Sequence, residues 1–169
     1  MKPIVSIIMG STSDLSVMEK AMNFLEDMQV PFEVNALSAH RTPDAVEQFA
    51  KGAKARGIKV IIAGAGMAAA LPGVIAASTP LPVIGVPIKG SVLDGVDALY
   101  SILQMPPGIP VATVAINGAM NAAILACQMI SLSDESIAKK MEDYKSGLGS
   151  KIEKANQTLA EIKYTFKTN

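Results

Sequence analysis

Polar and glycine-rich segments follow three of the apolar runs in this sequence. The runs are strand-like, and the segments that follow them are 10–14, 38–43 and 64–67. In a parallel sheet covered by helices, ligands bind at the carboxyl ends of the strands, where helix N-termini present free backbone N–H groups. We therefore expect these three segments to form one binding site.

The second segment contains the only histidine of the chain, His40, beside Arg41. Pro43 follows, and proline suits the first turn of a helix. Imidazole exchanges protons at neutral pH, and a guanidinium is well shaped to hold a phosphate. A lone histidine is often structural or simply exposed, but its position on this edge of the sheet favours a catalytic role. We predict that His40 is an acid–base residue.

The first segment places three hydroxyls and a carboxylate at a predicted helix start: Ser11, Thr12, Ser13 and Asp14. N-capping by Ser13 or Asp14 would account for one of these residues. Hydroxyls together with free N–H groups also suit a phosphate or a sugar. The segment by itself leaves both interpretations open.

The third segment carries Gly64 and Gly66, which would let the backbone approach a ligand closely. A Gly-x-Gly pair without a third glycine and a later acidic residue is a poor dinucleotide-binding fingerprint. The sequence also lacks a Walker motif, a nucleophile elbow and a set of zinc ligands. Cys127, the single cysteine, lies in an apolar predicted helix and is expected to fill space in the core.

The elements that must position these segments alternate along the chain. Apolar runs rich in valine and isoleucine begin every 24 to 28 residues, as in repeated strand–helix units. Strands are predicted at 4–9, 32–37, 59–63, 83–86 and 110–115. Helices are predicted at 14–28, 43–56, 68–77, 94–103 and 117–131. The strands are apolar on both faces, which is typical of parallel strands between two helix layers.

Composition narrows the class of protein. The chain has 169 residues, half of them hydrophobic, with 15 basic and 15 acidic side chains. A disordered chain would be less apolar, and a protein that binds nucleic acid or anionic membranes would carry a basic excess. No apolar run approaches the roughly 20 residues that span a bilayer, and a single cysteine fits a reducing compartment. We expect a soluble cytoplasmic protein whose partner is a small molecule or another protein.

Residues 137–162 carry a narrow apolar stripe at helical spacing. A helix over these residues would be ~38 Å long at ~1.5 Å per residue, longer than one face of a compact core of this size. It could fold back on its own domain, but its length favours an arm that packs on a neighbouring subunit. We therefore divide the single domain, 1–169, into an α/β core, 1–133, and a helical extension, 134–169, at a subunit interface.

The chain resembles the 5-(carboxyamino)imidazole ribonucleotide mutases of purine biosynthesis, the bacterial class of the aminoimidazole ribonucleotide carboxylase family. The resemblance covers nearly the whole chain. It rests on MGSTSD at 9–14, SAHRTP at 38–43, AGAG at 63–66, LPG at 71–73, LPVIGVP at 81–87 and GVDALYSILQMPPGIPVATVAI at 95–116. It implies a flavodoxin-like three-layer α/β sandwich, a homo-octamer with shared active sites, a ribonucleotide substrate and no cofactor or metal.

The resemblance also implies roles for individual residues. Ser13, Ser38 and Arg41 would hold the phosphate of the substrate, Asp14 its ribose hydroxyls, and Ser11 would line the site. Gly66, Ala70 and Leu71 complete the predicted substrate-binding set. His40 would move the proton while a carboxylate passes from the exocyclic nitrogen to a ring carbon, through carbon dioxide held in a closed pocket.

One departure concerns the third segment. Members of the family commonly have glycine where this chain has Met67, and a second histidine, associated with the carbon dioxide pocket, where it has Ala70. The carboxylase class found in animals typically has SAHK in place of SAHR, which favours the mutase. Two alternatives stay open: direct carboxylation of aminoimidazole ribonucleotide, and a non-catalytic protein that binds a phosphoribosyl ligand.

Overall fold

A computed structural model describes residues 1–169, except for the side chain of Lys151. Five parallel strands form one sheet in the order β2-β1-β3-β4-β5. Their bounds are β1 (Val5–Met9), β2 (Phe32–Ala36), β3 (Val60–Gly66), β4 (Val83–Ile88) and β5 (Ala112–Thr113). This is the flavodoxin-like strand order, in which the direction of winding reverses between β1 and β3. The predicted α/β fold with a central parallel sheet is confirmed.

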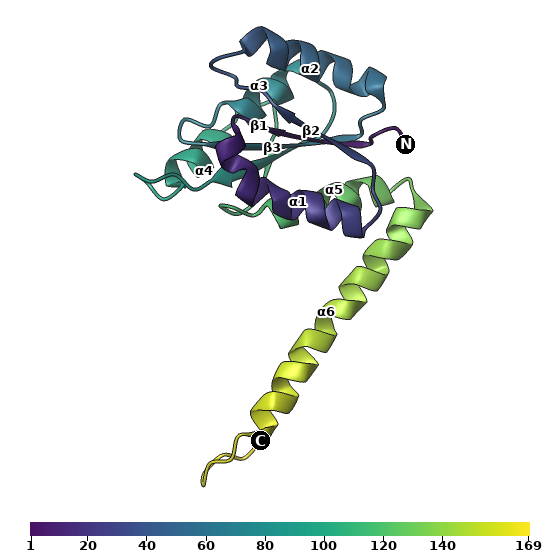
Figure 1. Ribbon diagram of the computed structural model, residues 1–169, viewed down its shortest axis with the longest axis vertical. Coiled ribbons are helices and arrows are strands. Elements are labelled where there is room, and N and C mark those ends of the chain that lie inside the picture. The colour runs from purple at the N-terminus through teal and green to yellow at the C-terminus, as the bar shows by residue number, and fades with distance from the viewer.

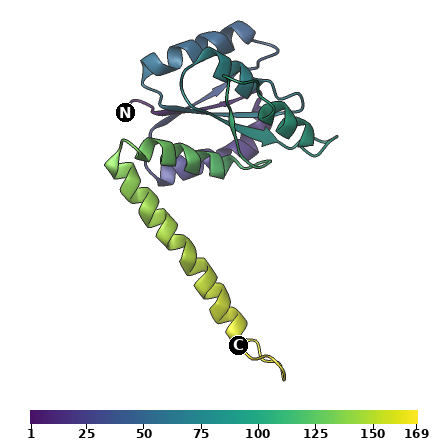
Figure 2. The ribbon, with the colours of Figure 1, turned by 180° about the vertical axis from the view of Figure 1, so that it is seen from behind.

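Helices cover both faces of the sheet and make three layers (Figures 1 and 2). One face packs against α1 (Leu15–Asp27) and α5 (Ala119–Ser131). The other face packs against α2 (Pro43–Arg56), α3 (Leu71–Ser78) and α4 (Val96–Leu103). The connections between parallel strands therefore bring the helix N-termini to the edge of the sheet where the strands end.

Alternation along β1 explains why the strand is apolar throughout. Val5, Ile7 and Met9 point into the core beneath α1 and α5, whereas Ile8 points into the core beneath α2. All five residues of β1 are buried, since each face of the sheet is covered by a helix layer.

Three predicted elements differ most from the structure, each for a specific physical reason. β3 continues to Gly66 because β4 runs alongside it to Ile88. β5 has two residues in place of six: Pro110 has no N–H to donate, and beyond Thr113 the chain turns toward the positive φ of Asn117. The helix predicted from residue 68 begins at Leu71, because Met67 has a φ of 56° that no α-helix accepts.

The last helix, α6 (Glu135–Glu161), leaves the body of the protein (Figures 1 and 2). Asp134 caps it by accepting a 3.1 Å hydrogen bond from the N–H of Ile137. Ile137 and Met141 are buried against the core, and the ring of Tyr144 meets Phe24 edge-on with centroids 5.1 Å apart. Beyond this point the helix extends into solvent, so the predicted C-terminal helical extension is present.

In the described part of the chain, no helix combines the length and the apolar character that a bilayer crossing requires.

Candidate active site

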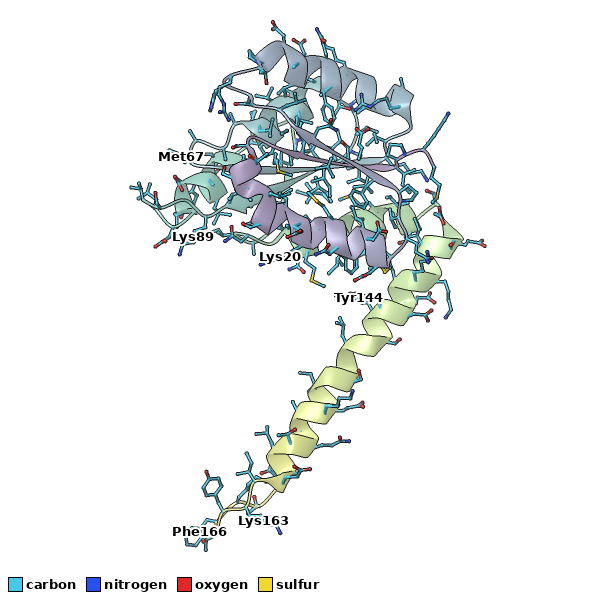
Figure 3. All side chains as sticks on the ribbon, viewed as in Figure 1. Lys20, Met67, Lys89, Tyr144, Lys163 and Phe166 are labelled. Carbon is cyan, nitrogen blue, oxygen red and sulfur yellow. The ribbon has the colours of Figure 1, made fainter. Side chains whose placement is uncertain are left out.

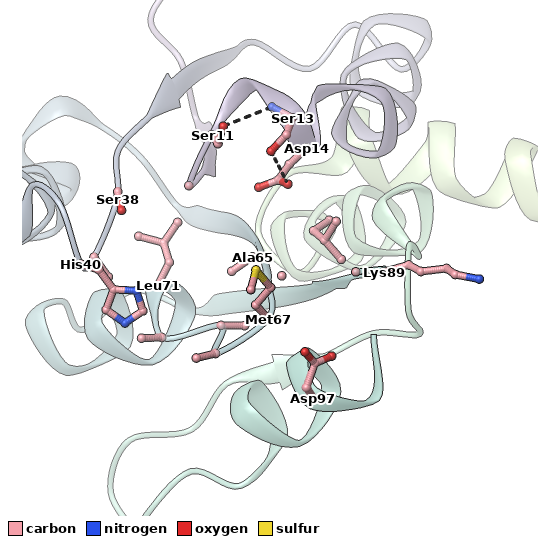
Figure 4. Close-up of a pocket in the computed structure, with 18 of the residues that line it drawn as sticks. Ser11, Ser13, Asp14, Ser38, His40, Ala65, Met67, Leu71, Lys89 and Asp97 are labelled. Carbon is pink, nitrogen blue, oxygen red and sulfur yellow. Dashed lines mark hydrogen bonds between the residues drawn. The ribbon is translucent and has the colours of Figure 1, made fainter. Parts of the chain in front are cut away.

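A cleft of about 790 Å³ lies at the carboxyl ends of the central strands. This volume is within the range of small-molecule sites, ~300–1,000 Å³. The structure brings every residue predicted for the site to its wall: Ser11, Ser13, Asp14, Ser38, His40, Arg41, Gly66, Ala70 and Leu71. They come from three separate loops, and Figure 4 shows how these loops converge.

The loop after β1 forms a short 3₁₀ turn, η1 (Thr12–Asp14), before α1. Ser11 caps this turn, because its Oγ accepts a 3.3 Å hydrogen bond from the N–H of Ser13. Asp14 occupies the N-cap position of α1 without a capping hydrogen bond from its side chain. The cap therefore falls to Ser11, which leaves Ser13 and Asp14 available to a ligand.

Asp14 is the carboxylate of this loop. Ser13 Oγ donates a 3.3 Å hydrogen bond to its Oδ1. Burial raises the pKa of Asp14 above its usual value, and the hydrogen bond from Ser13 partly opposes that rise. Ser13 and Asp14 together present a hydroxyl and a half-buried carboxylate, which can accept hydrogen bonds from the hydroxyls of a sugar.

The loop after β2 is a tight turn held by Ser38. The Oγ of Ser38 accepts from the N–H of Arg41 at 3.2 Å, and its carbonyl oxygen accepts from the N–H of Thr42 at 2.8 Å. This turn presents His40 and Arg41, both exposed, at the N-terminus of α2. The hydroxyl proton of Ser38 stays free to donate, so the turn can offer a hydroxyl, a guanidinium and a helix N-terminus to an anion.

The third segment differs from its prediction at one glycine. Gly64 lies within β3, and a Cβ there would stand 2.5 Å from the sulfur of Met18 in α1. Gly64 therefore serves helix–sheet packing and not the approach of a ligand. Gly66 does line the cleft, at the point where β3 ends beside Ile88.

Several residues of the cleft wall were missed by the sequence reasoning. The loop after β4 contributes Lys89, Gly90 and Ser91, and α4 contributes Asp97. The signal was present, because the rule that ligands bind at the carboxyl ends of strands applies to β4 as it does to the first three. Lys89 Nζ pairs with Asp94 at 2.9 Å, and its side chain extends away from the centre of the cleft in Figure 4.

The charges and hydrogen-bonding groups of the cleft suit an anionic, hydroxyl-bearing ligand. Arg41 supplies a positive charge, Asp14 and Asp97 supply acceptors, and His40 supplies a group for proton transfer. Among the described residues, no three histidine, cysteine, aspartate or glutamate side chains converge as metal ligands would.

Residues 4–151 match the family model described as AIR carboxylase. The chain belongs to the AIR carboxylase family. The match includes all the loops that build the cleft.

Relatives within the AIR carboxylase family carry two names. The chain is 52% identical over 162 residues to the N5-carboxyaminoimidazole ribonucleotide mutase of Thermotoga maritima, covering 96% of this chain and 95% of that protein. It is 62% identical over 143 residues to the phosphoribosylaminoimidazole carboxylase of Saccharomyces cerevisiae, covering 85% of this chain and 25% of that protein. The chain thus spans about a quarter of the length of the fungal carboxylases that it matches.

The fold of the AIR carboxylase family is also matched by a solved structure. The crystal structure of Treponema denticola PurE superposes with a TM-score of 0.84 at 33% sequence identity, covering 93% of this chain and 98% of that one. This agreement supports the flavodoxin-like sandwich.

Proposed function

We propose that this chain is a 5-(carboxyamino)imidazole ribonucleotide mutase of purine biosynthesis that needs no metal or cofactor. The observation that carries the proposal is the extent of the match to the Thermotoga maritima mutase, which covers almost the full length of both chains. A cleft lined by one imidazole, one guanidinium and several hydroxyls is consistent with this activity.

The proposed substrate fits the cleft with its phosphate near α2. Ser13, Ser38 and Arg41 hold the phosphate, and the free proton of the Ser38 hydroxyl supports this assignment. Asp14 accepts hydrogen bonds from the ribose hydroxyls. The ring then lies along the part of the wall formed by Ser11, Gly66, Ala70 and Leu71.

His40 serves both halves of the proposed reaction. Protonated His40 gives its proton to the exocyclic nitrogen as the N–C bond to the carboxylate breaks, which releases carbon dioxide and the aminoimidazole. The ring carbon then attacks carbon dioxide, and neutral His40 removes the proton from that carbon. The imidazole ends as it began, so a single acid–base group completes the isomerisation.

Direct carboxylation of aminoimidazole ribonucleotide is the second candidate. Within the matched segment, the identity to the Saccharomyces cerevisiae carboxylase is higher, at 62%, and this favours direct carboxylation. The cleft supports both reactions, because each ends with the same attack on carbon dioxide and the same removal of a proton from the ring carbon. A non-catalytic phosphoribosyl-binding protein would have no use for His40.

An isotope experiment separates the three functions. The purified full chain is given carboxyamino ribonucleotide labelled with ¹³C in its carboxylate, in unlabelled bicarbonate. A mutase forms product that retains the label, whereas a carboxylase forms unlabelled product and also converts aminoimidazole ribonucleotide with bicarbonate alone. A binding protein forms no product from either ribonucleotide, and this result would overturn the proposal.

We also propose that the chain assembles as a cytoplasmic homo-octamer in which α6 packs on a neighbouring subunit. Four apolar side chains on the part of α6 that leaves the body, or directly after its end, are each 42–65% exposed: Leu148, Ile152, Leu159 and Ile162. Figure 3 shows Tyr144 near the body and Phe166 at the far end of this arm. An isolated helix is only marginally stable in water, and an apolar stripe on it is best explained by a covering partner. A neighbouring subunit would also close the open cleft.

A further inference from the structure

Asn117 holds the start of the loop after β4 from a position 28 residues further along the chain. Its Oδ1 accepts a 2.9 Å hydrogen bond from the backbone N–H of Lys89, and its own N–H donates to the carbonyl oxygen of Pro87 at 2.8 Å. β5, the strand that pairs with β4, ends at Thr113. Asn117 therefore takes the place of a strand residue and continues the pairing of β4 beyond the end of β5.

The backbone and the packing around Asn117 fix this contact. Its φ is 58°, in the left-handed region, where asparagine and aspartate occur several-fold more often than most residues with a Cβ. Gly95 packs against the same point of the loop, because a Cβ there would stand 3.0 Å from the Cα of Lys89 and 2.8 Å from Cγ2 of Ile116. Lys89 is thus held between the segment that carries Asn117 and the start of α4.

The loop that begins at this point forms one side of the cleft. Residues 89–92 line the cleft, whereas Asn117 does not belong to its wall. Ile88, the last residue of β4, pairs in register with Gly66, which is part of the wall assigned to the ring. The loop after β4 therefore continues that wall.

The loop after β4 is separated from the site assigned to the phosphate. A Cβ on Gly90 would stand 3.9 Å from Cγ of Met67, so this loop contacts the segment after β3. In the sheet, β1 and β3 lie between β4 and β2, and the loop that follows β2 carries Ser38 and Arg41. The loop after β4 thus borders the ring, away from these two residues.

We infer that Asn117 is a positioning residue whose hydrogen bond to Lys89 fixes the loop after β4 against the ring of the bound ribonucleotide. The inference rests on the proposed function, which places the ring along Gly66 and the phosphate near α2. Asn117 acts through the loop and touches no ligand. Without its Oδ1, the N–H of Lys89 loses its partner and the ring loses a fixed neighbour, while the contacts to phosphate and ribose remain.

Two substitutions separate the side chain of Asn117 from its backbone. Asn117→Gly keeps the left-handed conformation and removes the acceptor, whereas Asn117→Asp keeps both. Gln29→Gly is the matched control: Gln29 has a φ of 54°, and its Oε1 accepts a 3.1 Å hydrogen bond from Lys140 Nζ. It follows α1 at the opposite edge of the sheet and does not belong to the cleft wall.

The first measurement compares a ligand that has the ring with one that lacks it. Calorimetry with the full chain measures aminoimidazole ribonucleotide, and competition against it measures ribose 5-phosphate. Asn117→Gly should weaken the binding of the ribonucleotide about three- to tenfold, as expected for the loss of one hydrogen bond, and the binding of ribose 5-phosphate by less than about twofold. Asn117→Asp should restore the ratio of the two affinities to within about twofold of wild type, and Gln29→Gly should leave it unchanged.

The second measurement is amide hydrogen exchange of a peptide that covers residues 89–92. Without ligand, this peptide should exchange at least about threefold faster in Asn117→Gly than in wild type, and at the wild-type rate in Asn117→Asp and Gln29→Gly. In the wild-type chain, saturating aminoimidazole ribonucleotide should slow the exchange, and saturating ribose 5-phosphate should not.

The outcomes separate the inference from the proposed function. Equal weakening of both ligands by Asn117→Gly, or no weakening of either, would overturn the inference while the proposed function stands. Unchanged exchange of residues 89–92 in this variant would also overturn it, since the loop would not depend on the hydrogen bond. Failure of the wild-type chain to bind either ligand would overturn both.

Discussion

The guanidinium of Arg41 donates a 2.9 Å hydrogen bond from Nη2 to the carbonyl oxygen of Gly10. The two residues are 31 positions apart and belong to the loops that follow β2 and β1. The bond ties the two loops together at the rim of the cleft. Arg41 lines the same cleft as Ser13 and Ser38, whose hydroxyls are assigned to the phosphate.

Arg41→Ala should weaken the binding of the ribonucleotide far more than the binding of its dephosphorylated nucleoside. Loss of a charge-assisted pair costs ~1.5–3 kcal/mol, or about 10- to 150-fold in dissociation constant. Arg41→Lys keeps the charge without the planar fork and should lie between wild type and Arg41→Ala. Calorimetry with both ligands checks this, and equal losses for nucleotide and nucleoside would remove Arg41 from the phosphate site.

His40→Asn should keep the fold and nucleotide binding but lose nearly all turnover. General acid–base catalysis contributes ~10²–10⁴-fold, and one imidazole would act in both proton transfers. His40 is exposed, so its replacement leaves no cavity. The assay uses protein purified from a host without its own enzyme, and substantial remaining turnover would exclude His40 as the acid–base group.

Met67→Gly should leave the free energy of unfolding unchanged or raise it by up to ~1.5 kcal/mol. Met67 has a φ of 56°, a conformation that costs a side-chain-bearing residue ~1–2 kcal/mol. Relief of this strain exceeds the ~0.4–1 kcal/mol that glycine adds to the entropy of the unfolded chain.

Met120→Gly is the matched control, because Met120 is also exposed but lies within α5. Met120 is in the first turn of α5, so glycine there should lower stability by at most the ~1 kcal/mol that it costs in a helix interior. Urea denaturation measures both variants, and equal destabilisation would show that the backbone at Met67 carries no strain.

Leu148→Ser with Ile152→Ser should lower the assembly state of the protein. Both side chains lie on the exposed apolar stripe of α6, beyond the buried contacts of Ile137 and Met141. Lys145→Ser with Glu153→Ser changes two exposed polar residues of α6 without changing the net charge, and should leave assembly intact. Sedimentation measures all three proteins, and a wild-type chain that is monomeric at micromolar concentration would refute the interface.

We expect the ionisation of Cys127 to lower the free energy of unfolding at alkaline pH. Burial raises the pKa of this thiol from 9.0 to about 11, partly opposed by the positive charge of Lys140. Below pH 9 the thiol is protonated in both the folded and unfolded states. Between pH 9 and 11 only the unfolded chain loses the proton, so the free energy of unfolding should decrease by about 2 kcal/mol over this window.

The comparison of Cys127→Ala with wild type isolates this effect, because tyrosines and lysines also titrate in the same range. Urea denaturation at pH 8, 9, 10 and 11 should give a shallower decrease for the variant. Parallel curves would show that the thiol ionises equally readily in both states.

The sequence alone determined the architecture and three of the loops that form the cleft wall. Strands that are apolar at every position, such as β1, require helices on both faces of the sheet, and strand-to-strand intervals of 24 to 28 residues leave room only for a helical crossover. The carboxyl ends of the strands must then lie at one edge. His40, Arg41 and Asp14 could be assigned to one site for that reason.

Contacts between distant segments were decided only by the tertiary structure. Gly64 is required because Met18 packs against it, and β3 is longer than predicted because β4 pairs with it. The side chain of Arg41 is held by its hydrogen bond to the carbonyl oxygen of Gly10. The role of Asn117 is likewise visible only once its surroundings are known. Hydrophobic periodicity indicates which face of a helix or strand is buried, but it does not indicate which residues of other elements pack against that face. Packing between segments brings those atoms together, and it acts over separations along the chain that local patterns do not encode.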